Sequence, residues 1–395
     1  MARFIALPVG QGDAFFLETD KGSVLVDGGR AIDGFATLFR EHTGRDDVDI
    51  LVVTHNDADH ANGVLGFLKA GFRCREIWLP GRWAEVLPHV LRPWEEVVYI
   101  LIPQVERAIA ELGERLEVLP GETLLERYAE TLENQRFENV DERERGEELE
   151  FGESGWPPLL ISQLEQAAEE EDFWGFLWPP FSPPRLWLGS HLELYRYYQQ
   201  RLFVEAIVAA KRIRQIAIEA FHRGIPVRWF EFDPMNSGGG LAWLQPLNSR
   251  QVVRVRRIPA ETLFHIIALT VYNRESLVFW ALPPYEGPGV LFTADSDLGS
   301  VCLPSLDGAI VTAPHHGSEA NKRVYKIIPE HTTNVTWVRS DGRFRKRPCK
   351  DYINAPGRKF CTLCRNPKFL KQAVRLFSDS QAWSRYPDVR SCVCR

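Results

Sequence analysis

The most constraining feature of the sequence is a loop of metal-binding side chains that directly follows a short apolar run. Ile50–Val53 has the composition of a strand buried on both faces, and the sequence THNDADHANG follows it at once. Four candidate metal ligands fall within six residues: His55, Asp57, Asp59 and His60. The chain turns at a strand end, so these side chains can converge, and burying them without a counter-charge would be costly. Imidazole and carboxylate together favour zinc, manganese or iron.

Two later apolar runs also end in candidate ligands. Val290–Thr293 leads into Asp295, and Ala309–Ala313 leads into His315 and His316. Ligand sites of open α/β sheets lie beyond the carboxyl ends of the strands, so the loops can build one site at one edge. A single Asp at a strand end usually forms a turn or a cap. Asp295 is therefore interpreted as a metal ligand only because the two other loops also carry candidate ligands.

The wider pattern indicates a core fold with an insertion. Strand-like and helix-like segments alternate over residues 1–80, which favours an α/β layered core. Residues 85–225 instead carry long helical patterns, an acidic stretch and a Trp- and Pro-rich patch, Phe173–Gly189. Strand patterns then return, over Val227–Phe232, Gln251–Arg256, Phe264–Tyr272, Ser276–Leu282 and Val290–Thr293. We expect a largely helical insertion in an α/β fold.

Several motifs occur in a fixed order along the chain: VGQGDAFFLET, VLVDGG, THNDADHANG, NRESLVF, LFTAD and APHHGS. Together they resemble the metallo-β-lactamase superfamily, and within it the soluble metallo-β-lactamase domain of the ComEC-type competence proteins and its stand-alone relatives. The resemblance covers residues 1–80 and 225–340. It implies an αβ/βα sandwich, in which two mixed sheets face each other and helices lie outside.

The resemblance divides the chain into expected segments. Residues 1–84 and 226–345 would form the two halves of the metallo-β-lactamase fold. Residues 85–225 would form the helical, acidic and Trp-rich insertion, and residues 346–395 a basic, Cys-containing C-terminal segment.

The resemblance also implies two divalent metal ions, zinc or manganese. His55 and Asp57 would hold one ion, and Asp59 and His60 the other. Asp295 would bridge the two ions. Asp57 stands where the superfamily motif HxHxDH has a second His, as in the ComEC-type branch. An oxygen ligand in place of a nitrogen ligand favours harder metal ions, so manganese becomes a candidate beside zinc.

Further residues complete the implied site. His316 or His315 would complete one coordination sphere, while Asp13, Asp27 and Asn273 would orient the ligands from behind. Asp27 before two glycines also fits a simple turn, and Asp13 in GQGD also fits a hairpin. The sequence departs from the family at LFTAD, where TGD is more usual, and at SDGRFRKRPCKDY, which lacks the expected late His.

A basic stretch points to the substrate. Lys322–Arg375 contains fifteen Lys and Arg against three acids, although the whole chain carries a net charge of −6. Four basic side chains follow the strand after HHGS: Arg343, Arg345, Lys346 and Arg347. Such clusters bind phosphate backbones by releasing counterions, but they also occur as solvated faces.

The leading hypothesis is a phosphodiesterase or nuclease that uses a metal-bound hydroxide. Asp59, His315 and His316 would be the catalytic residues, and DNA or RNA would bind the basic region. One alternative is hydrolysis of a small ester, lactone or phosphorylcholine-like group. Another is a degenerate metal site in a partner-binding subunit, with the Trp-rich insertion contacting a protein partner.

The C-terminal cysteines suggest a second metal site. Cys361-x2-Cys364 and Cys392-x-Cys394 are two close pairs, and in a cytosolic chain such pairs indicate structural zinc more readily than disulfides. Cys349 could substitute for one member, and unpaired thiols are the alternative. Because no long apolar run and no secretory signal occur, we expect a cytoplasmic protein without a membrane span.

Overall fold

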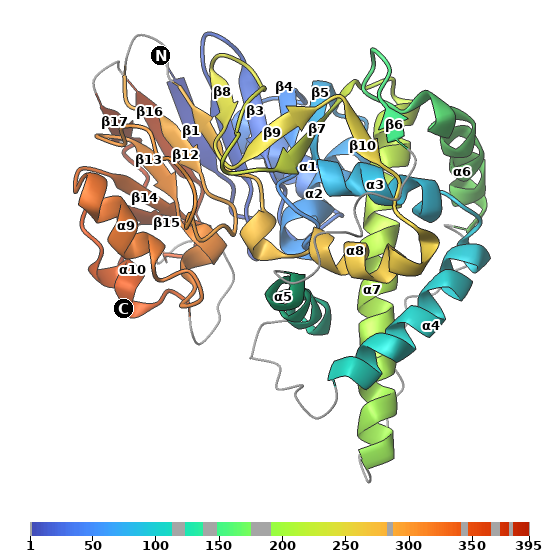
Figure 1. Cartoon of the computed structure of the whole chain (residues 1–395). Coiled ribbons are helices and arrows are strands. Elements are labelled where there is room, and N and C mark those ends of the chain that lie inside the picture. The colour runs from blue at the N-terminus through green and yellow to red at the C-terminus, as the bar shows by residue number, and fades with distance from the viewer. Residues whose placement is uncertain are drawn as a thin grey trace. The chain divides into compact units, whose positions relative to one another are not determined.

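The computed structural model describes residues 2–112, 123–136, 148–174, 191–282, 287–340, 347–364, 372–378 and 382–394. These residues form two compact units (Figure 1). The first comprises Met1–Gly81, Ile225–Val252 and Asn273–Arg395, and the second comprises Arg82–Gly224 and Val253–Tyr272. Among the described residues, no helix is long and apolar enough to span a membrane.

A nine-stranded sheet in the first unit has the order β17-β16-β1-β2-β3-β4-β5-β7-β9. The central strands β3, β4, β5 and β7 run parallel, and the pairs on both sides are antiparallel. The strands are β1 (Ala2–Ala6), β2 (Phe15–Glu18), β3 (Ser23–Val26), β4 (Asp47–Val52), β5 (Arg73–Pro80), β7 (Val227–Phe232), β9 (Ser249–Val252), β16 (Val374–Ser378) and β17 (Trp383–Arg385). Two crossover helices, α1 (Phe35–Thr43) and α2 (Ala58–Lys69), connect β3 to β4 and β4 to β5.

The second sheet of this unit has six strands in the order β15-β14-β13-β12-β11-β8. Strands β12 to β15 run parallel, while β11 is antiparallel to both of its neighbours. The strands are β8 (Leu244–Pro246), β11 (Phe279–Ala281), β12 (Val290–Phe292), β13 (Ile310–Thr312), β14 (Thr336–Arg339) and β15 (Arg358–Cys361), with helices α9 (Val324–His331) and α10 (Lys350–Asn354) between the later strands.

The two sheets share one hydrophobic core. Alternate residues of each strand point to opposite faces, and those on the inner faces of both sheets belong to one buried cluster. Phe4 and Phe15 of the first sheet lie 6.3 and 6.4 Å from Phe292 of the second, measured between ring centroids. On the opposite face of the first sheet, Phe16 packs edge-on against Phe39 of α1. The expected mixed α/β architecture is confirmed at this level.

The second unit is largely helical. Its elements are α3 (Gly81–Val90), α4 (Trp94–Leu112), α5 (Leu124–Arg136), α6 (Ile161–Trp174), α7 (His191–His222), α8 (Leu263–Thr270) and a two-stranded sheet of β6 (Glu148–Glu150) and β10 (Arg254–Arg256). Short 3-10 turns lie at η3 (Pro158–Leu160) and η4 (Ala260–Thr262) in this unit, and at η5 (Asn273–Glu275) and η7 (Pro314–Gly317) in the first unit. Buried Arg214 of α7 donates hydrogen bonds of 2.8 Å to the carbonyls of Val90 and Arg92, at the end of α3.

The prediction of a strand over Phe264–Tyr272 was wrong. This segment forms helix α8, which the structure groups with the helical unit. Nearly every residue of α8 is buried, and an apolar run buried on all sides has no periodicity that separates a helix from a strand. Most of the Trp-rich patch, residues 175–189, lies outside the described residues.

The C-terminal segment contributes to both sheets. Strand β15 extends the six-stranded sheet, and β16 pairs with β1 in the nine-stranded sheet. The segment after residue 345 therefore belongs to the same compact unit as the motif-bearing strands.

Candidate metal centre

Strand ends of both sheets bring the His and Asp side chains of the motifs together. His55 follows β4, and Asp59 and His60 lie in the first turn of α2. Asp295 follows β12, and His316 lies in η7 after β13. These positions span some 260 residues of sequence, yet the ligand atoms of His55, His60, Asp295 and His316 fall in two adjoining groups within the first unit. Asp59, predicted as a ligand, belongs to neither group, but its Oδ2 atom lies 3.4 Å from His316 Nε2.

The converging atoms form two groups that share one carboxylate. His55, Asp57 and Asp295 form the first group. The second group is Asp13, His60, Asp295 and His316. Within each group the candidate ligand atoms lie within 4.8 Å of one another. A carboxylate that belongs to two adjacent ligand groups is the arrangement expected for a pair of bridged divalent ions.

Contacts to their Nδ1 atoms orient His55 and His60, the two histidines of the His-Asp loop. The Nδ1 atom of His60 lies 2.8 Å from Asp27 Oδ2, and its Nε2 atom lies 3.2 Å from Asp295 Oδ1. The Nδ1 atom of His55 lies 2.9 Å from the hydroxyl of Thr54, which itself donates to Asp27. A partner on Nδ1 fixes the ring so that Nε2 faces the centre, which is how metal-binding histidines are usually oriented.

His316 is likewise oriented through its Nδ1 atom. Its Nδ1 atom lies 2.9 Å from Asp13 Oδ1 and 3.1 Å from the carbonyl of Ser340. Its Nε2 atom lies 3.4 Å from Asp59 Oδ2. Asp13 thus both orients His316 and contributes an oxygen to the second ligand group, where the sequence had suggested only the first role.

One buried nitrogen shows that the residues fit a cation. The side chain of His55 is 2% exposed, and its Nε2 atom makes no hydrogen bond with any residue that the structure describes. The nearest carboxylate oxygens belong to Asp57 and Asp295, at 3.7 and 3.9 Å. Asp57 is the N-cap residue of α2, but its side chain makes no capping hydrogen bond to the helix. A metal ion between these three groups would give the His55 nitrogen a partner and balance the charge of the two carboxylates.

The charge balance also favours cations. Burial opposes ionisation of Asp295, but His315 and His60 outweigh it and hold the pKa of that carboxyl well below its usual range. Burial opposes a charge on His60, yet Asp295 and Asp27 hold its pKa well above the usual value. Burial lowers the pKa of His55 to about 4, so the ring is neutral at pH 7 and ready to bind a metal. Ionised carboxylates in the interior need positive partners.

His315 and His316 occupy different positions. His316 is fully buried and belongs to a ligand group, whereas 17% of the His315 side chain is exposed. His315 Nε2 lies 3.9 Å from Asp295 Oδ2, and its Nδ1 lies 3.5 Å from the amide nitrogen of Asn273. Burial, together with the nearby charge of Arg347, lowers the pKa of His315 to about 4. The geometry therefore favours His316 as the ligand and places His315 at the solvent side.

Unusual backbone conformations cluster around the centre. Four non-glycine residues there have positive φ: Asp27 (60°), Ala294 (46°), His315 (46°) and His316 (54°). L-amino acids rarely adopt this region, and such residues concentrate at functional sites. The value at Ala294 explains why glycine is more usual at this position of the motif.

The predicted basic residues and cysteines are described only in part. Arg343, Arg345 and Lys346 lie outside the described residues, whereas Arg347 is described and half-buried. The four cysteines of the two pairs lie together, with their sulfur atoms within 4.8 Å of one another: Cys361, Cys364, Cys392 and Cys394. Cys349 is not part of this group; its sulfur accepts the backbone N–H of Tyr352 and caps α10.

Thr54 and Ser340 were missed by the sequence analysis. Thr54 bonds to both Asp27 and His55, and Ser340 bonds through its carbonyl to His316 and through its hydroxyl to the carbonyl of Gly12. The position of Thr54 directly before the His-Asp loop was a usable signal. Ser340 had none, because its role depends on the packing of the loop after β14.

Comparison with known proteins agrees with this geometry. No curated protein matches the chain. Residues 7–160 match the family model described as the metallo-beta-lactamase superfamily. The matched segment includes Asp13, Asp27 and the His-Asp loop, whereas Asp295 and His316 lie beyond it. The match supports a metallo-beta-lactamase fold for this part of the chain and indicates a metal-dependent hydrolase.

Proposed function

We propose that the chain is a phosphodiesterase or nuclease that depends on two divalent ions, zinc or manganese. The observation that carries the proposal is the sharing of Asp295 by two ligand groups, because paired ions suit the displacement of an oxygen from phosphorus. The shared core of the two sheets supports the expected αβ/βα sandwich, and the order of the motifs supports the ComEC-type branch. The cytoplasmic location stays a prediction.

The residues of the centre would have different roles in hydrolysis. When bound, divalent ions activate water and neutralise the negative charge that develops during hydrolysis. Asp27 and Asp13 hold His60 and His316 by their Nδ1 atoms, which leaves the Nε2 atoms as the ones that would bind the ions. His315, neutral and partly exposed at the edge of the centre, is placed to donate a hydrogen bond to a substrate oxygen.

Arg347 favours a phosphodiester over a neutral ester. Its charge contributes to the lowered pKa of His315. Two residues further on, the N–H of Cys349 donates to the carbonyl of Gly317 at 2.8 Å, so the segment that carries Arg347 is bonded to the turn after His316. Charge-assisted hydrogen bonds from arginine recognise phosphate oxygens strongly. A small ester or lactone would gain no comparable contact from this side chain.

The test compares two substrates with the same leaving group. With bis(p-nitrophenyl) phosphate, Arg347→Ala should raise KM about tenfold and change kcat little, because about 1.4 kcal/mol of binding to the phosphate is lost. With p-nitrophenyl acetate the variant should behave like the unchanged protein. Both substrates would be measured in the presence of Mn²⁺ and Zn²⁺.

The matched control is Arg75→Ala. The Arg75 side chain is 85% exposed and pairs with Asp49 near the start of β5, at the strand ends opposite the centre. It should change neither KM. Hydrolysis of the acetate or of a lactone with no turnover of the diester would favour the small-ester alternative. DNA or RNA as the natural substrate, and a protein partner for the Trp-rich patch, stay predictions.

A further inference from the structure

A buried arginine lies between the four cysteines and the His315–His316 turn. Arg339 ends β14, and its side chain is 2% exposed. One guanidinium nitrogen, Nη2, donates to the sulfur of Cys361 at 3.2 Å and to that of Cys394 at 3.4 Å. The other, Nη1, donates to the carbonyl of His316 at 3.5 Å. The side chain therefore contacts both sites.

The sulfur atoms are spaced for one metal ion and not for a disulfide. The Cys364 and Cys394 sulfurs lie 3.5 Å apart, and those of Cys394 and Cys361 lie 4.0 Å apart. A disulfide requires about 2.05 Å. Four thiolates bound tetrahedrally to zinc at about 2.3 Å lie roughly 3.8 Å from one another. The two measured distances lie on either side of that value.

The surrounding backbone favours sulfur in its anionic form. The N–H of Leu363 donates to the Cys361 sulfur at 3.3 Å, and the N–H of Val393 donates to the Cys364 sulfur at 3.1 Å. The N–H of Cys392 donates to the carbonyl of Lys359, which fixes the last pair beside β15. Donors directed at a sulfur atom stabilise the thiolate over the thiol.

The charge of Arg339 supplies an independent argument. A guanidinium group stays protonated in proteins, and a buried charge needs an opposite charge nearby. Among the described residues, no ion pair joins Arg339 to a carboxylate, and the acidic groups it contacts are cysteines. Thiolate charge on the cysteines would neutralise this guanidinium group, and several thiolates at these distances repel one another unless a cation lies between them.

We propose that Cys361, Cys364, Cys392 and Cys394 bind a structural zinc ion, and that the zinc thiolates position Arg339 to hold the His315–His316 turn. The turn needs such support, because both histidines have positive φ. Arg339 would thus be a positioning residue that couples the zinc site to the metal ligand His316. The zinc site stands on its own; only its coupling to the turn rests on the proposed function.

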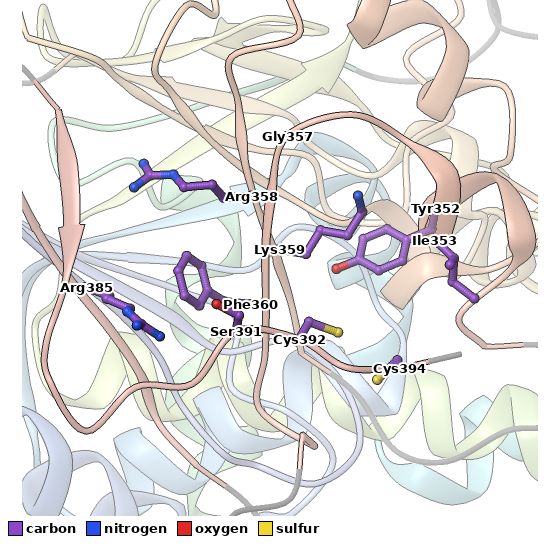
Figure 2. Close-up of a pocket in the computed structure, with 10 residues that line it drawn as sticks. All are labelled: Tyr352, Ile353, Gly357, Arg358, Lys359, Phe360, Arg385, Ser391, Cys392 and Cys394. Atoms are coloured by element: carbon purple, nitrogen blue, oxygen red, sulfur yellow. The ribbon is translucent and has the colours of Figure 1, made fainter.

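The zinc site is tested first in the unchanged full-length chain. Cys392 and Cys394 line a pocket of about 570 Å³. Figure 2 shows both side chains among the pocket residues, so small reagents can reach this pair. Reconstitution with Co²⁺ should give the intense visible absorption of tetrahedral thiolate coordination, and zinc should displace it. A chain that binds no zinc at the cysteines and has two fewer titratable thiols would contain a disulfide instead, which would overturn the proposal.

Two double variants then assign the ion. Cys361→Ser/Cys364→Ser should lose one zinc per chain and the cobalt absorption. The matched control, Cys74→Ser/Cys302→Ser, changes two cysteines outside the cluster and should lose neither. Retention of all zinc by the first variant would overturn the zinc site. If the His–Asp centre of the unchanged chain bound no Mn²⁺ while this zinc stayed, the proposed function would fail and the zinc site would stand.

Arg339→Met tests the coupling. With its fold intact by circular dichroism, it should bind Mn²⁺ at the His–Asp centre about tenfold more weakly, which is typical of losing a group that supports a metal ligand. Arg390→Met, at an exposed arginine, should bind Mn²⁺ normally. Unchanged Mn²⁺ affinity in Arg339→Met would overturn the coupling.

Discussion

Replacing Asp295 with Asn is expected to remove both metal ions from the His–Asp centre and to abolish most of the hydrolytic activity. Asp295 is the one residue common to both ligand groups. Asn keeps the size of the side chain but removes the charge and one oxygen. Loss of a group that only supports a ligand costs about 10–100-fold in metal affinity, so loss of a shared ligand should cost more than about 100-fold for each ion.

The measurement is titration of the metal-depleted protein with Mn²⁺ and Zn²⁺. The matched control is Asp297→Asn, two residues further along the same loop. Asp297 accepts the N–H of Gly299 and pairs with Arg274 at 3.7 Å; it belongs to neither ligand group. It should bind both ions with unchanged affinity. If Asp295→Asn also bound both ions as tightly as the unchanged protein, the assignment of the shared carboxylate would be wrong.

Substituting Gly63 with Ala should strongly destabilise the fold near the centre. A Cβ atom at this position would lie 1.9 Å from the carbonyl oxygen of Gly28. The two segments are already joined by hydrogen bonds, from the N–H of Gly63 to the carbonyl of Gly29 and from the N–H of Gly28 to the carbonyl of His60. Both sides of the clash are backbone, so α2 must move away from the loop after β3.

We expect a loss of about 3 kcal/mol in the free energy of unfolding, at the upper end of the usual cost of overpacking. Urea denaturation of the metal-depleted protein measures it. Gly238→Ala is the control, because a Cβ there has no atom within 4 Å, and it should change stability by less than about 1 kcal/mol. A change of similar size in both variants would contradict the close packing of α2.

The sequence marks the candidate ligands that lie in local motifs. His55, Asp59 and His60 fall in one short loop, and Asp295 and His316 follow apolar strands. Parallel strands bring Asp295 and His316 to one edge of the six-stranded sheet, as the pattern predicts. The mixed α/β architecture could be predicted for the same reason. His55 and His60 follow a strand of the other sheet, so the two sets meet only because the two sheets pack together.

Features that depend on tertiary packing could not be predicted. Nothing in the sequence marks the contact of Arg339 with Cys361, because it arises only when β14 and β15 pair in register. The second role of Asp13, as a member of a ligand group, depends on how closely the first loop approaches His316. Helix α8 was mistaken for a strand because the run it occupies is buried on every side.

The most direct test of the account is elemental analysis of the purified full-length chain and of the double variant Asp59→Ala/His60→Ala. The unchanged protein should contain about three divalent ions, two in the His–Asp centre and one zinc at the cysteines. The variant should contain about one, the zinc. An unchanged metal content in the variant, even after reconstitution with Mn²⁺ and Zn²⁺, would contradict the dinuclear centre and favour a partner-binding role for the fold.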